Sequence, residues 1–232
     1  MLEKFKILAL IPARGGSKGI KDKNIINLAG KHLIGYTIEA AKKSKYIDNV
    51  VVTTDSSKIA EVSKKYGASV PFIRPAELAA DTSKTIDAVL HAKEELKRQG
   101  EEYDVLILLQ ATSPLRTVED LDGAIETFYN SHFQSVVSVS EVRDNPLLIR
   151  SIDAEGRLEK ILDVSSTCRR QDMPKYYKVN GSIYINMMEE ISENTSFNDN
   201  VIPYVIESSH AVDIDSFEDL VVAEYMFSVN MQ

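Results

Sequence analysis

Residues 7–19 read Ile-Leu-Ala-Leu-Ile-Pro-Ala-Arg-Gly-Gly-Ser-Lys-Gly, an apolar run that passes directly into a glycine-rich, basic turn. The apolar run predicts a buried strand over 7–12. The glycines allow a tight turn with exposed backbone N–H groups, because no Cβ blocks close approach. This turn and the residues after it concentrate positive charge, although the chain as a whole has a formal charge of −8. Four cations lie within ten residues: Arg14, Lys18, Lys21 and Lys23. Such a turn is suited to hold a polyphosphate, although an ordinary surface turn with solvated lysines fits the same residues.

Length and composition indicate one large globular domain. Chains usually split into domains only beyond roughly 250 residues, and this chain has 232. Its 44% hydrophobic and 27% charged residues are typical of soluble proteins. A pI near 5.1 argues against binding to nucleic acids or membranes, which are anionic. The single cysteine, Cys168, excludes an intramolecular disulfide framework. Without a secretory leader pattern or a long apolar run, a cytoplasmic location is expected.

Strand-like and helix-like segments alternate along most of the chain. Further strands are predicted at residues 49–54, 70–73, 105–109, 135–140 and 181–185. Apolar residues at helical spacing lie between them, and a last helix is predicted from about Ser216. This order predicts an α/β fold with an open, mostly parallel, Rossmann-like sheet.

Residues 141–180 interrupt the alternation. They are irregular, with two short apolar runs and the basic pair Arg169-Arg170. We therefore expect a single domain over 1–232 in which 141–180 is an insertion that leaves the main sheet and serves an interface.

Polar clusters follow four of the predicted strands. They are the glycine–lysine turn, Thr54-Asp55, Arg74-Pro75 and the run from Gln110 to Arg116. Ligands of open parallel sheets bind at the carboxyl ends of the strands, so we expect these clusters to converge at one edge.

The spacing within the first turn excludes two common nucleotide motifs. A Walker loop needs a glycine immediately before its lysine, whereas Ser17 separates Gly16 from Lys18. Gly15 and Gly16 are adjacent, so the GxGxxG dinucleotide fingerprint is absent as well.

Asp213-Ile214-Asp215 precedes the last predicted helix. In an extended segment, side chains two residues apart point the same way, so both carboxylates can face one point. Paired carboxylates suit Mg²⁺, which is commonly shared with substrate phosphates. Capping of the helix by Asp215 and Ser216 fits equally, and the two roles are compatible.

A second cationic region comprises Arg169, Arg170 and Lys178, followed by Asn180-Gly181. Arginine can clamp a carboxylate through two hydrogen bonds, so this region could bind the acid group of a second substrate. A solvated or interface patch is the alternative. The four histidines are scattered, and the sequence indicates neither a Ser-His-Asp nor a Cys-His set.

Taken together and in order, these motifs resemble the CMP-sialic acid synthetase (N-acylneuraminate cytidylyltransferase) family, including members similar to CMP-legionaminic acid synthetases. The resemblance runs from about residue 5 to residue 220. The segments that carry it are 11–19, Lys23-Asn24, Arg74-Pro75, 110–116, Arg170-Gln171 and 213–215.

The resemblance implies the nucleotide-diphospho-sugar transferase type of fold. It implies transfer of CMP from CTP to the anomeric 2-hydroxyl of a nonulosonic acid, such as N-acetylneuraminate or a legionaminate-like sugar, with Mg²⁺ and release of pyrophosphate. It also implies a homodimer in which the 141–180 insertion reaches toward the partner's active site.

Residue roles carry over by matching position. CTP would be held by Ala13, Arg14, Gly15, Ser17, Lys18, Lys23, Asn24, Arg74, Asp81, Thr82 and Ser83. The sugar acid would contact Gln110, Thr112, Arg170, Lys178 and Asn180. The metal would bind Asp213 and Asp215. Catalytic roles would fall to Arg14, Lys18, Lys23 and Asp215.

Two positions depart from the family pattern. Ala111 replaces a frequent proline, and Lys178 stands where sialic acid enzymes often have arginine, which leaves the identity of the sugar open. One alternative is a cytidylyltransferase for the eight-carbon acid 3-deoxy-manno-octulosonate. An alternative from another class is a noncatalytic module that binds CTP.

Overall fold

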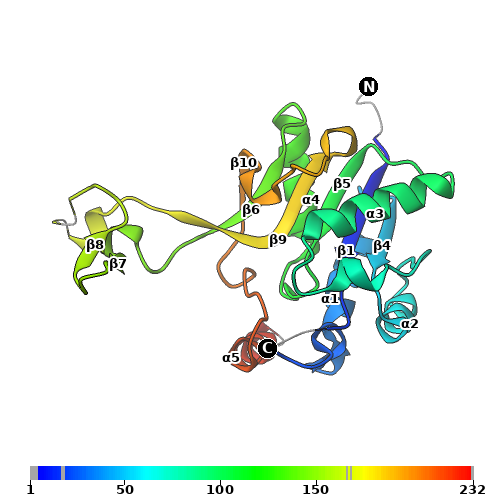
Figure 1. The fold of residues 1–232 in the computed structure, drawn as a ribbon, viewed down its shortest axis with the longest axis horizontal. Coiled ribbons are helices and arrows are strands. Elements are labelled where there is room, and N and C mark those ends of the chain that lie inside the picture. Colours follow the sequence, from blue (N-terminus) through cyan, green and yellow to red (C-terminus); the bar gives the residue numbers. More distant parts are fainter. Residues whose placement is uncertain (1–4, 17–18, 166, 168, 231–232) are drawn as a thin grey trace.

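The computed structural model describes residues 5–16, 19–165, 167 and 169–230, with only the backbone of Arg170 and Asn230. Across these residues the molecule centres on a six-stranded sheet in the order β10-β6-β9-β5-β1-β4 (Figure 1). Only β9 runs antiparallel to its neighbours, so the predicted α/β class and mostly parallel sheet are confirmed. The strands are β1 (Ile7–Pro12), β4 (Asn49–Thr53), β5 (Val105–Leu109), β6 (Val136–Glu141), β9 (Tyr177–Met187) and β10 (Ile202–Val205).

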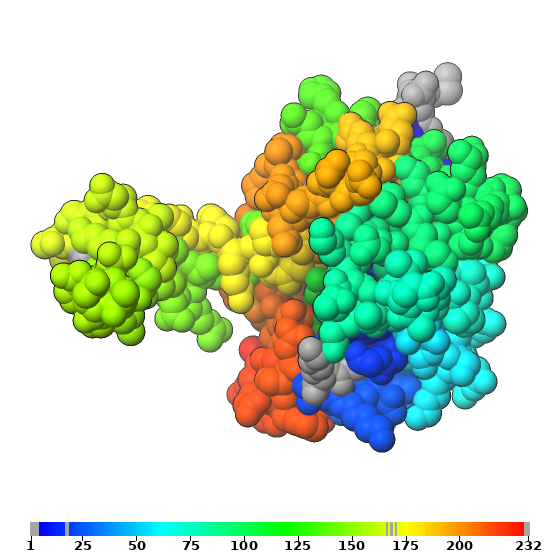
Figure 2. Space-filling view, viewed as in Figure 1, coloured from blue at the N-terminus to red at the C-terminus, as the bar shows by residue number. Residues whose placement is uncertain are grey.

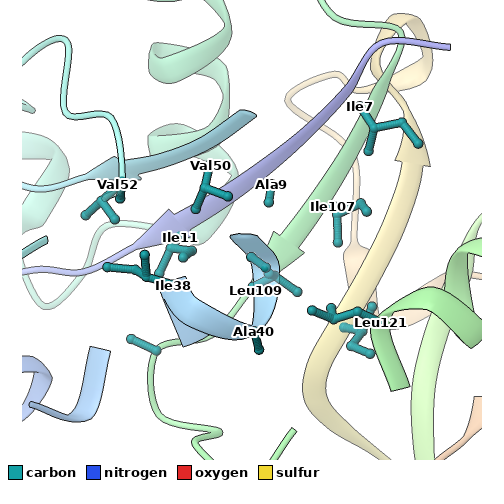
Figure 3. Close-up of a cluster of buried hydrophobic side chains, with 14 of the residues drawn as sticks. Ile7, Ala9, Ile11, Ile38, Ala40, Val50, Val52, Ile107, Leu109 and Leu121 are labelled. Atoms are coloured by element: carbon teal, nitrogen blue, oxygen red, sulfur yellow. The ribbon is translucent and has the colours of Figure 1, made fainter. Parts of the chain in front are cut away.

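Helices cover both faces of the sheet because its central strands are apolar on both sides. In β1, Ile7, Ala9 and Ile11 face the layer of α1, α2 and α4, whereas Leu8 and Leu10 face α3 (Figure 3). This burial on two faces explains why the central strands read as continuous apolar runs. The helices are α1 (Leu33–Lys43), α2 (Ser57–Lys65), α3 (Thr85–Arg98), α4 (Val118–Asn130) and α5 (Phe217–Asn230).

The prediction of a strand at residues 70–73 is wrong. Ser69 forms an isolated bridge with Val51, and the chain then leaves the sheet. Pro71 lacks the N–H group that a paired strand would need, which explains the early end. The chain nevertheless stays at the sheet edge, because the Arg74 N–H donates to the Thr54 carbonyl at 2.8 Å.

An arm projects from the sheet between β6 and β9 (Figures 1 and 2). The sheet continues to the pair Glu141 and Tyr177, so the segment outside it is 142–176, shorter than predicted. The arm contains a hairpin of β7 (Arg150–Ile152) and β8 (Leu158–Lys160). The resumption of strand character, predicted at 181, starts at Tyr177.

A third apolar cluster joins the two ends of the chain. It combines Ile20, Leu28 and Leu33 with Ile214, Leu220 and Ala223. Leu28 belongs to the short hairpin of β2 (Asn27–Leu28) and β3 (Lys31–His32), and the last two residues belong to α5. The predicted last helix is confirmed and lies against the segment that follows β1 (Figure 1).

The remaining elements are short 3-10 turns at Lys23–Ile25, Ala76–Ala79, Pro146–Leu148, Arg170–Asp172, Met188–Glu190 and Phe197–Asp199. No helix in the described part of the chain is long and apolar enough to cross a membrane.

Phe128 tests the packing of α4 on the sheet. Its side chain is fully buried, so Phe128→Ala should lower the free energy of unfolding by about 3–5 kcal/mol. The control Phe217→Ala removes a ring that is 60% exposed and should change stability by less than about 1 kcal/mol. Urea denaturation measures both, and equal losses would contradict this account of the core.

Candidate active site

Backbone and side-chain hydrogen bonds shape the turn after β1. The Ala13 N–H donates to the Thr53 carbonyl at 3.0 Å, and the Gly15 N–H donates to the Asp55 carboxylate at 2.9 Å. The buried Asn24 donates its amide to the Arg14 carbonyl at 2.9 Å. Asn24 therefore holds the turn in place.

A cavity of about 420 Å³ opens at the carboxyl edge of the sheet. It is lined by the turn after β1, the segments around residues 74–85 and 110–112, and Asp215. The predicted nucleotide or metal residues that line it are Arg14, Lys23, Asn24, Arg74, Asp81, Ser83 and Asp215. The clusters expected at this edge therefore converge, with Asp55 joined to them through Gly15. We call this the donor cavity.

Other residues assigned to the nucleotide lie elsewhere. Ala13 is buried beneath the turn, and Thr82 is exposed outside the cavity lining. Ser17 and Lys18 lie outside the described residues, so their assigned roles stay predictions.

Three cations that line the donor cavity, Arg14, Lys23 and Arg74, have an acidic neighbour. Arg14 pairs with Asp81 at 2.9 Å, and Arg74 lies 3.9 Å from Asp55. Arg74 is only 5% exposed, and burial lowers its pKa while Asp55 opposes that shift. Its buried Nε has no hydrogen-bond partner among the described residues. Buried donors are normally paired, so this one is available to a ligand.

The acidic segment 213–215 meets the first turn. Lys23 Nζ lies 2.7 Å from Asp215 Oδ1, although the two residues are 192 positions apart. The backbones also touch, because a Cβ on Gly19 would lie 2.5 Å from the Asp215 carbonyl oxygen. The glycine-rich turn and Asp215 therefore meet at the donor cavity.

Burial of Ile214 orients the two carboxylates. Ile214 is fully buried, and its N–H donates to the Thr112 carbonyl at 2.9 Å. Asp213 and Asp215 flank it and turn away from the apolar cluster, as alternation in an extended chain requires. Burial raises the pKa of Asp213, and its Oδ1 has no partner among the residues described.

Ser216 and Asp219 cap α5 reciprocally. The Asp219 N–H donates to Ser216 Oγ at 3.3 Å, and the Asp219 carboxylate accepts N–H bonds from Ser216 at 2.8 Å and Asp215 at 3.1 Å. The cap therefore leaves the Asp215 side chain for Lys23. Asp219 was not predicted, although the Ser-x-x-Asp spacing is a capping signal.

A second cavity, of about 850 Å³, lies on the other side of Gln110. Gln110 lines both cavities, and so the two meet at its side chain. Lys178, Asn180 and Asp213 also line this space, which we call the acceptor cavity. Thr112, assigned to the sugar, lines the donor cavity instead. The Arg170 side chain lies outside the described set, and its backbone belongs to the arm.

The side chain of Asn180 is held by hydrogen bonds to its oxygen, whereas its NH₂ group has no partner among the described residues. Its Oδ1 accepts from Ser138 Oγ at 2.7 Å and from the Ser182 N–H at 3.1 Å, whereas its buried Nδ2 has no partner in the described structure. The next residue, Gly181, has φ 75°, and a Cβ there would lie 2.8 Å from Gln110 Oε1. Glycine at 181 thus leaves room for the Gln110 side chain.

Arg116 is a structural residue that the sequence analysis did not assign. Its buried guanidinium donates to the Ser182 carbonyl and to Thr37 Oγ1, both at 2.8 Å, and to the Gln110 carbonyl at 3.4 Å. Burial lowers its pKa to about 10. Arg116 therefore ties β9 and α1 to the residue that both cavities share.

Comparison with known proteins identifies the family. A family model described as cytidylyltransferase matches residues 8–220. The chain belongs to the cytidylyltransferase family. It is 40% identical, over 98% of its length, to the CMP-N,N'-diacetyllegionaminic acid synthase of Legionella pneumophila, of which 99% is covered. It is 34% identical, over 94% of its length, to the N-acylneuraminate cytidylyltransferase of Streptococcus agalactiae, of which 52% is covered.

These relatives confirm the predicted CMP-sialic acid synthetase family and its enzyme class, nucleotidyltransferase. A solved structure titled CMP:2-keto-3-deoxy-manno-octonic acid synthetase complexed with CTP has a TM-score of 0.73. The two sequences are 15% identical, and the matched region covers 97% of this chain and 99% of the chain of that structure. At that identity the likeness shows the fold alone.

Gly19→Ala tests whether the contact between the turn and Asp215 matters. The added Cβ would overlap the Asp215 carbonyl and separate Lys23 from its carboxylate, so we expect CTP affinity to fall about tenfold or more. The control is Glu94→Ala, which changes an exposed side chain on α3 that lines neither cavity and should keep the wild-type affinity. Calorimetry measures both, and equal affinities would contradict the expected coupling.

Proposed function

We propose that the chain transfers CMP from CTP to the anomeric 2-hydroxyl of a nonulosonic acid and releases pyrophosphate. The observation that supports this most is the pair of cavities joined at Gln110 and bordered by Asp213 and Asp215. A transfer between two substrates needs two adjoining sites, with the charged groups at their junction.

CTP fits the donor cavity on charge. Arg14, Lys23 and Arg74 line a space at the end of β1, where the glycine turn lets phosphate oxygens approach the backbone. Lys18 would add a further cation. A nucleotide substrate also accords with a cytoplasmic location, which we include in the proposal.

The sugar acid fits the acceptor cavity. Lys178 offers a cation to its carboxylate, and the unused Asn180 Nδ2 offers a hydrogen bond. The 2-hydroxyl would then lie beside Gln110, next to the α-phosphate of the nucleotide.

Mg²⁺ suits the carboxylates at the junction. Asp213 presents a buried oxygen without a partner among the described residues, and Asp215 lies two residues away. No group of three or more His, Cys, Asp or Glu side chains in the described chain could hold a metal. Mg²⁺ usually takes one or two protein carboxylates together with substrate phosphates and water, so two are sufficient. When bound, the ion would neutralise charge that develops on the phosphates.

The remaining chemistry falls to the protein. The sugar oxygen forms a bond to the α-phosphorus while the bond to pyrophosphate breaks. Lys23 and Lys18 would offset negative charge on the phosphates, and Arg14 would orient them. Asp215 is our candidate to accept the hydroxyl proton.

The test combines CTP and Mg²⁺ with N-acetylneuraminate, N,N'-diacetyllegionaminate or 3-deoxy-manno-octulosonate, and measures pyrophosphate. We expect turnover with a nine-carbon acid, because the relatives that are 40% and 34% identical are named for diacetyllegionaminic acid and N-acylneuraminate. Turnover with the eight-carbon acid alone would favour the alternative cytidylyltransferase. Tight CTP binding without pyrophosphate from any acid would identify a noncatalytic module.

Asp213→Asn tests the metal proposal. Loss of one carboxylate should lower kcat about a hundredfold or more and raise the Mg²⁺ concentration needed for half-maximal rate. The control Asp122→Asn changes an acid on α4 that bonds to Ser44 and lies outside both cavity linings. An unchanged Mg²⁺ dependence in folded Asp213→Asn would remove Asp213 from the site.

We also propose that the arm mediates a homodimer. Its exposed apolar side chains are Leu148, Ile149, Ile152, Leu158, Ile161 and Val164. A two-stranded hairpin is at best marginally stable alone, so a partner surface is expected to cover it.

The dimer proposal predicts the effect of charge on one face of the hairpin. Ile152 and Leu158 are paired across it and are 71% and 72% exposed. The double variant Ile152→Asp/Leu158→Asp should shift a dimer to a monomer, because it places two charges in an apolar interface. Ser151→Asp, on the opposite face, is the control. Sedimentation velocity decides, and a double variant that sediments as the wild type would contradict the arm's role.

A further inference from the structure

One face of α5 forms a wall of the acceptor cavity. Asp219, Val222 and Met226 line the cavity, and their spacing places them on one face of the helix. At 1.5 Å per residue, this stripe is roughly 10 Å long. Asp219 lies at the reacting end, because its carboxylate accepts the Asp215 N–H at 3.1 Å. Val222 and Met226 therefore line the part of the cavity that extends away from the junction.

The other side of α5 anchors this stripe. Leu220 and Ala223 are buried against the segment after β1. The ring of Phe227 packs on Tyr36 with a centroid distance of 4.5 Å, and the Tyr36 hydroxyl donates to the Leu28 carbonyl at 2.7 Å. The helix is thus held on α1 and β2, which fixes Val222 and Met226 in relation to the cavity.

The walls of the acceptor cavity differ in polarity. One wall comes from the end of β6, the start of the arm and the start of β9, and it is charged and polar: Arg143, Lys178 and Asn180 lie there with the acids Glu141 and Asp144. On the other wall, Ala211 and Val212 continue the apolar surface of α5. In the proposed function, the carboxylate of the sugar acid binds at Lys178 and the 2-hydroxyl lies beside Gln110. In that orientation the tail of the sugar, C7 to C9, would extend along the apolar wall formed by Val222 and Met226.

We propose that Val222 and Met226 select nonulosonic acids whose tail carries a C9 methyl and a C7 acylamino group over acids with a hydroxylated tail. The inference rests on the proposed function of the acceptor cavity. Hydroxyl groups against these two side chains would lose hydrogen bonds to water without replacement. Methyl and acyl groups there would remove apolar surface from water.

A substrate series on the wild-type enzyme tests the selection directly. N-acetylneuraminate has the hydroxylated tail, its 9-deoxy derivative changes only C9, and N,N'-diacetyllegionaminate carries both the methyl and the acylamino group. We expect kcat/KM to rise about tenfold on the first change and further on the second, as methyl-sized differences do in apolar pockets. An equal or higher kcat/KM for the hydroxylated tail would overturn the proposal.

A matched pair of double variants locates the selection on α5. Val222→Ser/Met226→Gln should lower the kcat/KM ratio of diacetyllegionaminate to N-acetylneuraminate about ten- to a hundredfold. Val221→Ser/Val229→Gln introduces the same two polar residues at positions on α5 that do not line the cavity, so it should keep the wild-type ratio. An unchanged ratio in the first variant overturns the assignment.

Two further readouts separate the possible failures. CTP affinity reports whether each variant folds, because α5 lies outside the donor cavity lining. If the first variant does not fold, the wild-type substrate series decides alone. If acids with either tail release pyrophosphate at equal kcat/KM, only the proposed selection is refuted. If no nonulosonic acid leads to pyrophosphate release, the proposed function itself is refuted.

Discussion

The site depends on the burial of one apolar side chain, Ile214. It joins the cluster that α5 forms with Ile20, Leu28 and Leu33, and this packing brings a late segment against the first turn. Because Ile214 faces inward, its two acidic neighbours must face the cavities. The hydrophobic effect thus places two carboxylates beside a basic turn. It acts against the repulsion between the two carboxylates and against their loss of hydration.

A second constraint fixes the positions of the two cavities relative to each other. Gln110 directly follows β5. Glycine at position 181 of β9 leaves the space that its side chain occupies, and its carbonyl accepts from Arg116. The two terminal nitrogens of the buried Arg116 guanidinium find their acceptors on β9, α1 and Gln110, whereas its Nε has no partner among the described residues. Moving β9 or α1 would leave more of this buried charge unpaired, which is costly. The wall between the cavities is therefore set by the same hydrogen bonds that hold the sheet and α1 together.

The sequence predicted the parts of this arrangement that local pattern controls. Continuous apolar runs identified β1 and β5, since both are buried on two faces. The run at 70–73 failed because Pro71 prevents pairing despite its apolar neighbours. Arg116 was missed because a charged residue is ordinarily exposed, and only the folded chain shows its partners. The position of α5 along the acceptor cavity depends on packing between distant segments, which no local pattern encodes.

The acidic partners of the donor cavity explain how a cationic site can exist in a folded chain before nucleotide binds. Arg14, Lys23 and Arg74 would repel one another if each stood alone, yet each lies near a carboxylate. The pair of Arg14 and Asp81 is partly solvated, so exchanging that carboxylate for a phosphate changes the free energy little. Arg74 is different, because its burial makes an added anion more favourable. The cavity therefore combines a partly solvated cation, Arg14, with two cations that are largely removed from water, Lys23 and Arg74.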